Sequence, residues 1–295
     1  MPSEIPKLRM GTCNWKYDSW RNLIYSNEKK INYLQEYSRH YNTVEIDQWF
    51  WSLFGINKIS LPSPSTVLEY SRSVPPDFKF TVKVPNSITL THFYKQDRND
   101  PLVANPYFLS VDLFDEFLKS IEPLRNQLGP LMFQFEYLNR QKIPSQNQFQ
   151  EKFLDFLRKT DPACQYALEI RNPNYLNDSY FQFLRENHLG MVFLQGYYMP
   201  PVFEVYEKFK EQMGETAVIR LHGPDRSEIE KISGGNWNRI WEPKDEELSK
   251  IAQMIIDLLG RKRNVYVNVN NHYEGSAPLS IRRLTEILES LMPGG

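Results

Sequence analysis

Cysteine is scarce in this chain: Cys13 and Cys164 are the only two among 295 residues, and they are far apart. Two such cysteines provide neither a disulfide framework nor a cysteine zinc cluster. The chain also lacks an excess of charge of either sign, because it has 35 basic and 36 acidic residues and a formal net charge of −1. Such a chain has no overall attraction for nucleic acid or for an acidic membrane surface.

Long apolar segments are absent as well. No run approaches the roughly 20 apolar residues that a membrane-spanning helix needs, and the first residues, MPSEIPKLRMG, lack the apolar segment of a signal peptide. We therefore expect a soluble, cytoplasmic protein without a membrane partner. The signatures GxGxxG, GxxxxGKS/T, GxSxG and CxxC do not occur, so dinucleotide, P-loop and hydrolase-elbow sites have no support.

Eight short apolar segments recur along the chain, each followed by polar or turn-forming residues. They have the length of strands and cover residues 9–15, 42–47, 77–85, 129–136, 165–171, 190–196, 216–223 and 264–271. Apolar residues at helical spacing predict helices between most of them, over residues 30–41, 110–128, 145–159, 174–188, 243–259 and 278–291. Residues 63–74 and 202–213 show less regular helical patterns.

Strand and helix alternate eight times, which indicates a parallel sheet with crossover helices. Eight such units favour closure into a (β/α)8 TIM-like barrel, and an open doubly wound sheet is the alternative. No linker rich in Gly or Ser interrupts the pattern, so residues 1–295 are predicted to form a single domain. Residues 86–106 lack a helical period and are predicted to form a long loop after the third strand, at the active face.

Side chains alternate between the two faces of a strand, and this alternation sorts six of the eight segments in the same way. One face is apolar, whereas the other becomes polar toward the end of the strand. In QYALEIR (165–171), Leu168 and Ile170 share the apolar face, whereas Glu169 and Arg171 share the polar one. In a barrel the polar faces point into the lumen, so charges of both signs are predicted to meet at the C-terminal mouth. A purely structural ion network is the alternative.

Several separated segments resemble the YecE-like family, catalogued as domain of unknown function 72. They are GTCNW (11–15), Trp20-Arg21, YSRHYNTVEID (37–47), PPDFKFTVKVP (75–85), LGPLMFQF (128–135), YALEIRNP (166–173), IRLHG (219–223) and NVNNHYEGSAP (268–278). The resemblance covers nearly the whole chain and implies a TIM-like barrel whose activity is not established. The chain departs from the family pattern at residues 47–51, which are rich in aromatics, and at Asn271-His272, where an acidic residue often follows the paired Asn.

The positions that match the family lie at the predicted mouth, and they are Glu45, Lys83, Gln134, Glu169, Arg171, Arg220, His222, Asn270 and Asn271. Glu45 and Glu169 are the predicted general acid or base, because burial and neighbouring cations set the pKa of such carboxyl groups. His222 is a second candidate for proton transfer. These three are the predicted catalytic residues.

Ligand binding is predicted for the cations of the mouth. Lys83, Arg171 and Arg220 suit a phosphate or carboxylate, because guanidinium groups match the geometry of these anions. The remaining predicted ligand-binding residues are polar or aromatic: Gln134, Asn270, Asn271 and Trp15. Trp15 is predicted to stack on a ligand ring, with ordinary packing as the alternative reading of its side chain.

The predicted function is that of an enzyme or a ligand-binding barrel that holds a small anionic or polyhydroxylated molecule and uses glutamate acid–base chemistry. Two alternatives remain open: a repair-type, endonuclease-like barrel that accepts a flipped nucleotide, and a non-catalytic metabolite-binding protein. A metal-assisted version of this chemistry, with Glu45, Glu169, His222 and His272 as ligands, is a further, less favoured alternative. No metal site is predicted, because the five histidines show no HxH or HExxH spacing and because Lys83, Arg171 and Arg220 would repel a cation. The cofactor and the oligomeric state are left open.

Overall fold

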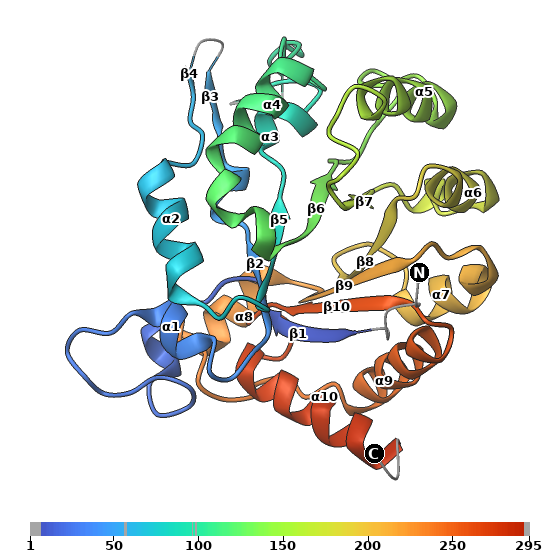
Figure 1. Ribbon diagram of the computed structural model, residues 1–295. Helices are drawn as coiled ribbons and strands as arrows, with labels where there is room; N and C mark the ends of the chain where they lie inside the picture. The colour runs from blue at the N-terminus through green and yellow to red at the C-terminus, as the bar shows by residue number, and fades with distance from the viewer. Residues whose placement is uncertain (1–6, 56–57, 96, 98, 292–295) are drawn as a thin grey trace.

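The computed structural model describes residues 7–55, 58–95, 97 and 99–291. Its main sheet has eight parallel strands in the order β1-β10-β9-β8-β7-β6-β5-β2. The sheet curls so that its edge strands β1 and β2 come together, and helices surround it on the outside (Figure 1). This nearly closed parallel sheet confirms the predicted (β/α)8 TIM-like barrel and excludes the open doubly wound sheet.

Each predicted strand segment contains one barrel strand. These are β1 (Leu8–Thr12), β2 (Thr43–Ile46), β5 (Lys79–Lys83), β6 (Leu128–Gln134), β7 (Tyr166–Glu169), β8 (Gly190–Gly196), β9 (Thr216–Gly223) and β10 (Asn264–Val269). Most of them are shorter than the apolar pattern, so Trp15, Arg171 and Asn270 lie in loops rather than in strands. The sequence pattern does not predict β3 (Leu53–Gly55) and β4 (Lys58–Ile59), which pair antiparallel and project from the barrel (Figure 1).

The predicted helical segments also each contain a helix. They are α1 (Tyr33–Tyr37), α2 (Pro64–Ser73), α4 (Val111–Ser120), α5 (Gln146–Leu157), α6 (Asp178–Glu186), α7 (Val202–Phe209), α9 (Asp245–Gly260) and α10 (Ala277–Leu291). Ser63, Ser110 and Ser145 cap three of them, because each hydroxyl accepts a backbone N–H of the first turn.

Several predicted boundaries are corrected by the structure. The helix expected over 30–41 is limited to α1, and residues 122–127 at the end of the segment 110–128 form a 3-10 helix. The predicted loop 86–106 begins with the short helix α3 (Asn86–Thr89), and α8 (Arg226–Ser233) is an additional helix after β9. Residues 96 and 98 of that loop lie outside the described part of the chain.

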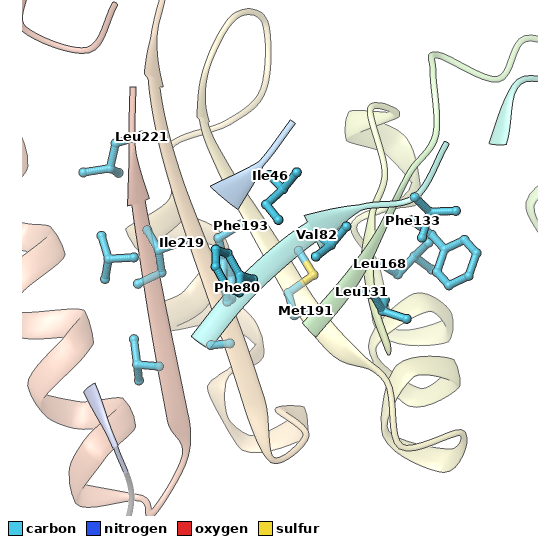
Figure 2. Packing of buried hydrophobic residues seen from close by; sticks show 14 of the residues in the cluster. Ile46, Phe80, Val82, Leu131, Phe133, Leu168, Met191, Phe193, Ile219 and Leu221 are labelled. Atoms are coloured by element: carbon cyan, nitrogen blue, oxygen red, sulfur yellow. The ribbon is translucent and has the colours of Figure 1, made fainter. Parts of the chain in front are cut away.

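Two buried clusters flank the wall of the barrel, as the alternation along the strands predicts. The outer cluster joins the strands to the helices, and Figure 2 labels several of its strand residues, among them Phe133, Leu168 and Ile219. Burial of each such side chain stabilises the fold by roughly 1.5–3 kcal/mol. The inner cluster occupies the lumen and consists of Met132, Ala167, Val192, Val218 and Tyr266.

Side chains close the seam between β1 and β2, whose described residues share no backbone ladder. The hydroxyl of Tyr37 accepts a hydrogen bond from the Thr12 amide at 2.8 Å and donates one to the Thr43 carbonyl at 3.0 Å. Asn42 accepts from the Met10 amide at 3.1 Å. The tyrosine therefore satisfies backbone groups that a neighbouring strand would otherwise pair.

Tyr37→Phe is expected to lower the free energy of unfolding by roughly 2–4 kcal/mol, because the buried Thr12 amide and Thr43 carbonyl each lose a partner at a cost of about 1–3 kcal/mol. Urea denaturation followed by circular dichroism would measure the change. Tyr41→Phe is the matched control, since the Tyr41 ring lies 4.8 Å from the Tyr37 ring but its hydroxyl does not bridge the seam. Equal losses in the two variants would contradict this account of the seam.

Candidate functional site

Arg220 lies at the centre of a buried ion cluster near the C-terminal ends of the strands. It is carried by β9 and is only 1% exposed. Its Nε and Nη2 donate to the two carboxylate oxygens of Glu45 on β2, at 2.8 and 2.7 Å. Its Nη1 donates to Glu169 on β7 at 2.5 Å and to Gln134 on β6 at 3.3 Å. One guanidinium therefore connects three strands across the lumen.

Glu169 has a second cationic partner. The Nε of Arg171, just beyond β7, donates to its Oε1 at 3.0 Å, and the Arg171 side chain is 23% exposed. Burial alone would raise the pKa of Glu169, but the charges of Arg220, Arg171 and Lys83 outweigh it and hold that pKa at about 2. The carboxylate therefore stays ionised at neutral pH.

Hydrogen bonds from the neighbouring strands complete the environment of Glu45, which is fully buried. Asn268 on β10 donates to Glu45 Oε2 at 3.3 Å and to the Thr81 hydroxyl on β5 at 2.9 Å. The ion cluster is therefore embedded in a polar layer directly above the apolar inner cluster.

Lys83 ends β5, and Asp47 directly follows β2, the adjacent strand. The parallel register of β2 and β5 pairs Glu45 with Thr81 and ends at Ile46 and Val82, and the charges of Asp47 and Lys83 act on each other just beyond it. Burial, together with the Arg220 charge, lowers the pKa of Lys83 to about 8. Burial and the Glu45 charge raise the pKa of Asp47 to about 6. Both groups therefore titrate much closer to neutral pH than usual.

His222, two residues after Arg220 on β9, contacts a cysteine and a tyrosine. Its Nε2 lies 3.7 Å from Cys13 Sγ, and its Nδ1 lies 3.5 Å from the Tyr197 hydroxyl. Burial, with the charges of Arg220 and Arg171, holds the pKa of His222 well below its ordinary value. Burial also raises the pKa of the Cys13 thiol. The pair is therefore a neutral imidazole beside a neutral thiol.

Three predicted site residues lie apart from the ion cluster. Trp15 is buried and packs edge-on against Tyr70 of α2, with ring centroids 5.0 Å apart. Asn270 accepts from the His272 amide at 3.0 Å, and Asn271 accepts from the Ala277 amide at 2.9 Å, where α10 begins. Their local contacts are those of packing and turn residues, and their predicted binding roles stay predictions.

Tyr197 and Asp47 are not among the predicted site residues. Tyr197 follows β8 with a positive φ of 54°, and its ring centroid lies 5.1 Å from the Arg171 guanidinium carbon. A backbone in this region is unusual for a non-glycine residue and marks a position that the surroundings enforce. The two tyrosines that directly follow the end of the 190–196 segment were the available signal.

Exposed aromatic side chains occur on the segments that follow β2, β5, β6 and β8. They are Trp51, Phe54, Tyr94, Tyr137, Tyr197 and Tyr198. The rings of Trp51 and Tyr94 lie 6.3 Å apart, although they come from the loops after β2 and β5. Large exposed apolar groups on one face of a monomer indicate a contact surface for a ligand or a partner.

Cavities lie elsewhere on the molecule. One of about 790 Å³ is lined by β1, α10 and the residues after α1, and one of about 670 Å³ lies beside Trp15 and Tyr70. Neither is lined by a residue of the ion cluster, so the charges rather than the cavity volumes locate the candidate site.

Over the described residues, no group of three or more His, Cys, Asp or Glu is arranged to hold a metal ion. In the same part of the chain, no helix is both long and apolar enough to cross a membrane.

The parallel barrel, with its ion cluster below a rim of loops, defines a TIM-like barrel protein with a polar C-terminal mouth. The family model described as Protein of unknown function DUF72 matches residues 9–293, and the chain belongs to this family.

Relatives agree with this assignment. The UPF0759 protein YunF of Bacillus subtilis is 24% identical over 281 residues, which cover 87% of this chain and 86% of YunF. The UPF0759 protein YecE of Escherichia coli is 25% identical over 167 residues, 56% of this chain but 49% of YecE, so the match spans about half of that relative.

Solved structures show the same fold. One is the crystal structure of a DUF72 family protein from Enterococcus faecalis V583. Its superposition covers 98% of this chain and 97% of the other chain, with a TM-score of 0.66 and 18% sequence identity. One from Thermotoga maritima MSB8 covers 96% and 99%, with a TM-score of 0.66 and 21% identity. None of these descriptions assigns an activity or a ligand.

Proposed function

We propose that the C-terminal mouth of the barrel binds a small anionic, polyhydroxylated molecule, such as a sugar acid or a phosphorylated sugar. The observation that carries this proposal is the state of Arg171. Only its Nε is engaged by a protein acceptor, Glu169, and its two terminal nitrogens have no hydrogen-bond partner among the described residues. A partly exposed guanidinium with two free donors suits a carboxylate or a phosphate.

Charge around Arg171 supports an anionic ligand. Arg220 neutralises Glu45 and Glu169 through direct hydrogen bonds, so these carboxylates oppose an incoming anion less than free ones would. Lys83 adds a second cationic group at the end of β5 when it is protonated. The electrostatic potential that attracts an anion and the unengaged nitrogens of Arg171 therefore lie at the same end of the barrel.

Aromatic rings around the mouth support a ligand with a sugar-like face. Tyr197 already stacks under Arg171, and the Arg171 charge acts on the hydroxyls of Tyr94 and Tyr198. Tyrosine combines an apolar ring with a hydroxyl that hydrogen-bonds, which suits a polyhydroxylated molecule.

Acid–base chemistry at this site is assigned to several groups. Asp47, with a pKa of about 6, exchanges a proton near neutral pH more readily than Glu169, which remains ionised. The predicted acid–base roles of Glu45 and Glu169 stay predictions, and at this site the ionised Glu169 acts through its charge on the bound ligand and on Arg171. A purely binding protein would use the same cations without turnover.

Arg171→Gln is expected to weaken the binding of an anionic ligand by roughly 10- to 100-fold, because charge-assisted hydrogen bonds contribute about 1.5–3 kcal/mol. Isothermal titration calorimetry with inorganic phosphate, gluconate and glucose 6-phosphate would measure this, with glucose as the uncharged comparison. Arg125→Gln is the matched control, since Arg125 pairs with Asp161 on the outer surface at 2.7 Å.

Affinity for the anions that is equal in wild type and Arg171→Gln would contradict the proposal. So would binding of glucose as tight as that of glucose 6-phosphate. Tight, strongly salt-dependent binding of a short DNA oligonucleotide, without affinity for the small anions, would favour the nucleic-acid alternative instead.

A further inference from the structure

Lys83 is a buried amine without an anionic partner. It is the last residue of β5 and is 9% exposed. Its Nζ lies 4.1 Å from the centroid of the Phe50 ring. Within the described residues, Nζ forms neither an ion pair nor a hydrogen bond, although the side chain points toward a lumen that contains three carboxyl groups. A structural lysine in such a place would be expected to pair with one of them.

Arg220 explains why none of the carboxyl groups pairs with Lys83. The charged groups that face Lys83 are Glu45 and Asp47 from β2 and the residue after it, Glu169 from β7, and Arg220 from β9. Glu45 and Glu169 both turn to the guanidinium, at 2.7 and 2.5 Å. Asp47 instead accepts from Asn14 Nδ2 at 3.3 Å. The amine is thereby left beside a cation and an aromatic face.

We propose that Lys83 is a nucleophile that forms a Schiff base with an aldehyde or ketone bound at the mouth of the barrel. Enzymes activate lysine for this reaction by burying the amine in an apolar environment or by placing it beside another cation. Burial at the end of β5 provides the first condition, and Arg220 provides the second. The proposal rests on the proposed function, because it uses the same mouth and assigns Arg171 to an anionic group of the carbonyl compound.

The reaction requires a neutral amine and a group that moves protons. The nitrogen lone pair of Lys83 attacks the carbonyl carbon, and a C–N bond forms as the C=O π bond breaks. The nitrogen then gives up one proton and the oxygen takes one up, which gives a neutral carbinolamine. Loss of that hydroxyl as water, with a second proton, leaves a protonated imine on Nζ. Asp47 directly follows β2, the strand next to β5, and its charge acts on Lys83, so we assign it to donate and accept these protons.

Reductive methylation tests the amine itself, independently of any ligand. Formaldehyde is small enough to reach a buried amine, and sodium cyanoborohydride supplies the hydride that traps the imine as a secondary amine. Near pH 7.5, a pKa of about 8 leaves roughly a quarter of the amine neutral, against about 0.1% for an ordinary lysine. Peptide mapping by mass spectrometry is expected to show Lys83 modified at least about tenfold faster than exposed lysines.

Glyoxylate then tests the substrate class, because it combines an aldehyde with a carboxylate. With cyanoborohydride it is expected to label Lys83, and Arg171→Gln is expected to slow that labelling about tenfold while leaving formaldehyde labelling unchanged. Lys83→Arg removes the adduct from this peptide. Lys79→Arg is the matched control, because Lys79 lies on the same face of β5 at the opposite end and donates to the Asn126 carbonyl.

Each outcome decides the matter. If formaldehyde labels Lys83 no faster than exposed lysines, Lys83 is not the proposed nucleophile. If Arg171→Gln still weakens phosphate binding in that case, the proposed anion-binding function is retained. If formaldehyde labels Lys83 fast but glyoxylate labels it at the same rate in wild type and in Arg171→Gln, the claim that Arg171 binds an anionic group of the substrate is refuted. If Arg171→Gln also leaves phosphate binding unchanged, the proposed anion-binding function is refuted as well.

Discussion

Arg220→Met is expected to lower the free energy of unfolding by roughly 3–5 kcal/mol, a large part of the stability of a typical domain. Methionine fits the space of the arginine stem but leaves Glu45 and Glu169 buried without their common partner. Both carboxylates must then take up protons or draw water into the lumen, and each response costs free energy. The expected result is a protein that is partly unfolded at moderate temperature.

Thermal and urea denaturation would measure this loss, and two comparison variants separate its causes. Arg171→Met removes a partly exposed guanidinium that has one acidic partner, so a loss below about 1.5 kcal/mol is expected. The triple variant Glu45→Gln, Glu169→Gln, Arg220→Met removes the three charges together and is expected to recover much of the stability. A triple variant as unstable as Arg220→Met would show that shape, not uncompensated charge, makes Arg220 important.

Gly11→Ala is expected to destabilise the protein by about 3 kcal/mol or more, at or above the usual range for overpacking. A Cβ at Gly11 would lie 1.9 Å from the Thr43 carbonyl oxygen and 2.8 Å from the Tyr37 hydroxyl. The first contact is with backbone of the adjacent strand, which cannot rotate away as a side chain can. The methyl group therefore forces β1 and β2 apart at the seam that closes the barrel.

Gly260→Ala provides the opposite expectation. A Cβ there meets nothing within 4 Å, and the residue ends helix α9, so alanine is expected to be neutral or to stabilise by up to about 1 kcal/mol. Urea denaturation of both variants would give the comparison. A Gly11→Ala protein as stable as wild type would mean that the two strands do not approach each other as closely as described.

Local sequence patterns do not predict which individual side chains contact one another. Glu45 and Arg220 lie on predicted lumen faces, but they are 175 positions apart, and their bidentate contact depends on the curvature of the whole sheet. The same contact explains why Lys83 has no acidic partner within the described part of the chain. Trp15 shows the reverse case: the strand β1 ends at Thr12, three residues before it, and the side chain packs against Tyr70 of α2.

The amino-acid sequence by itself determined the eight barrel strands, most of their helices and, for six strands, the face that bears polar groups, because these depend on periodicities of two and 3.6 residues within short windows. Only the tertiary structure decided which charges meet, which groups have shifted pKa values, and how Gly11 and Tyr37 close the barrel. Those features depend on distances of a few ångströms between strands that are remote in the chain, and no local pattern encodes such distances.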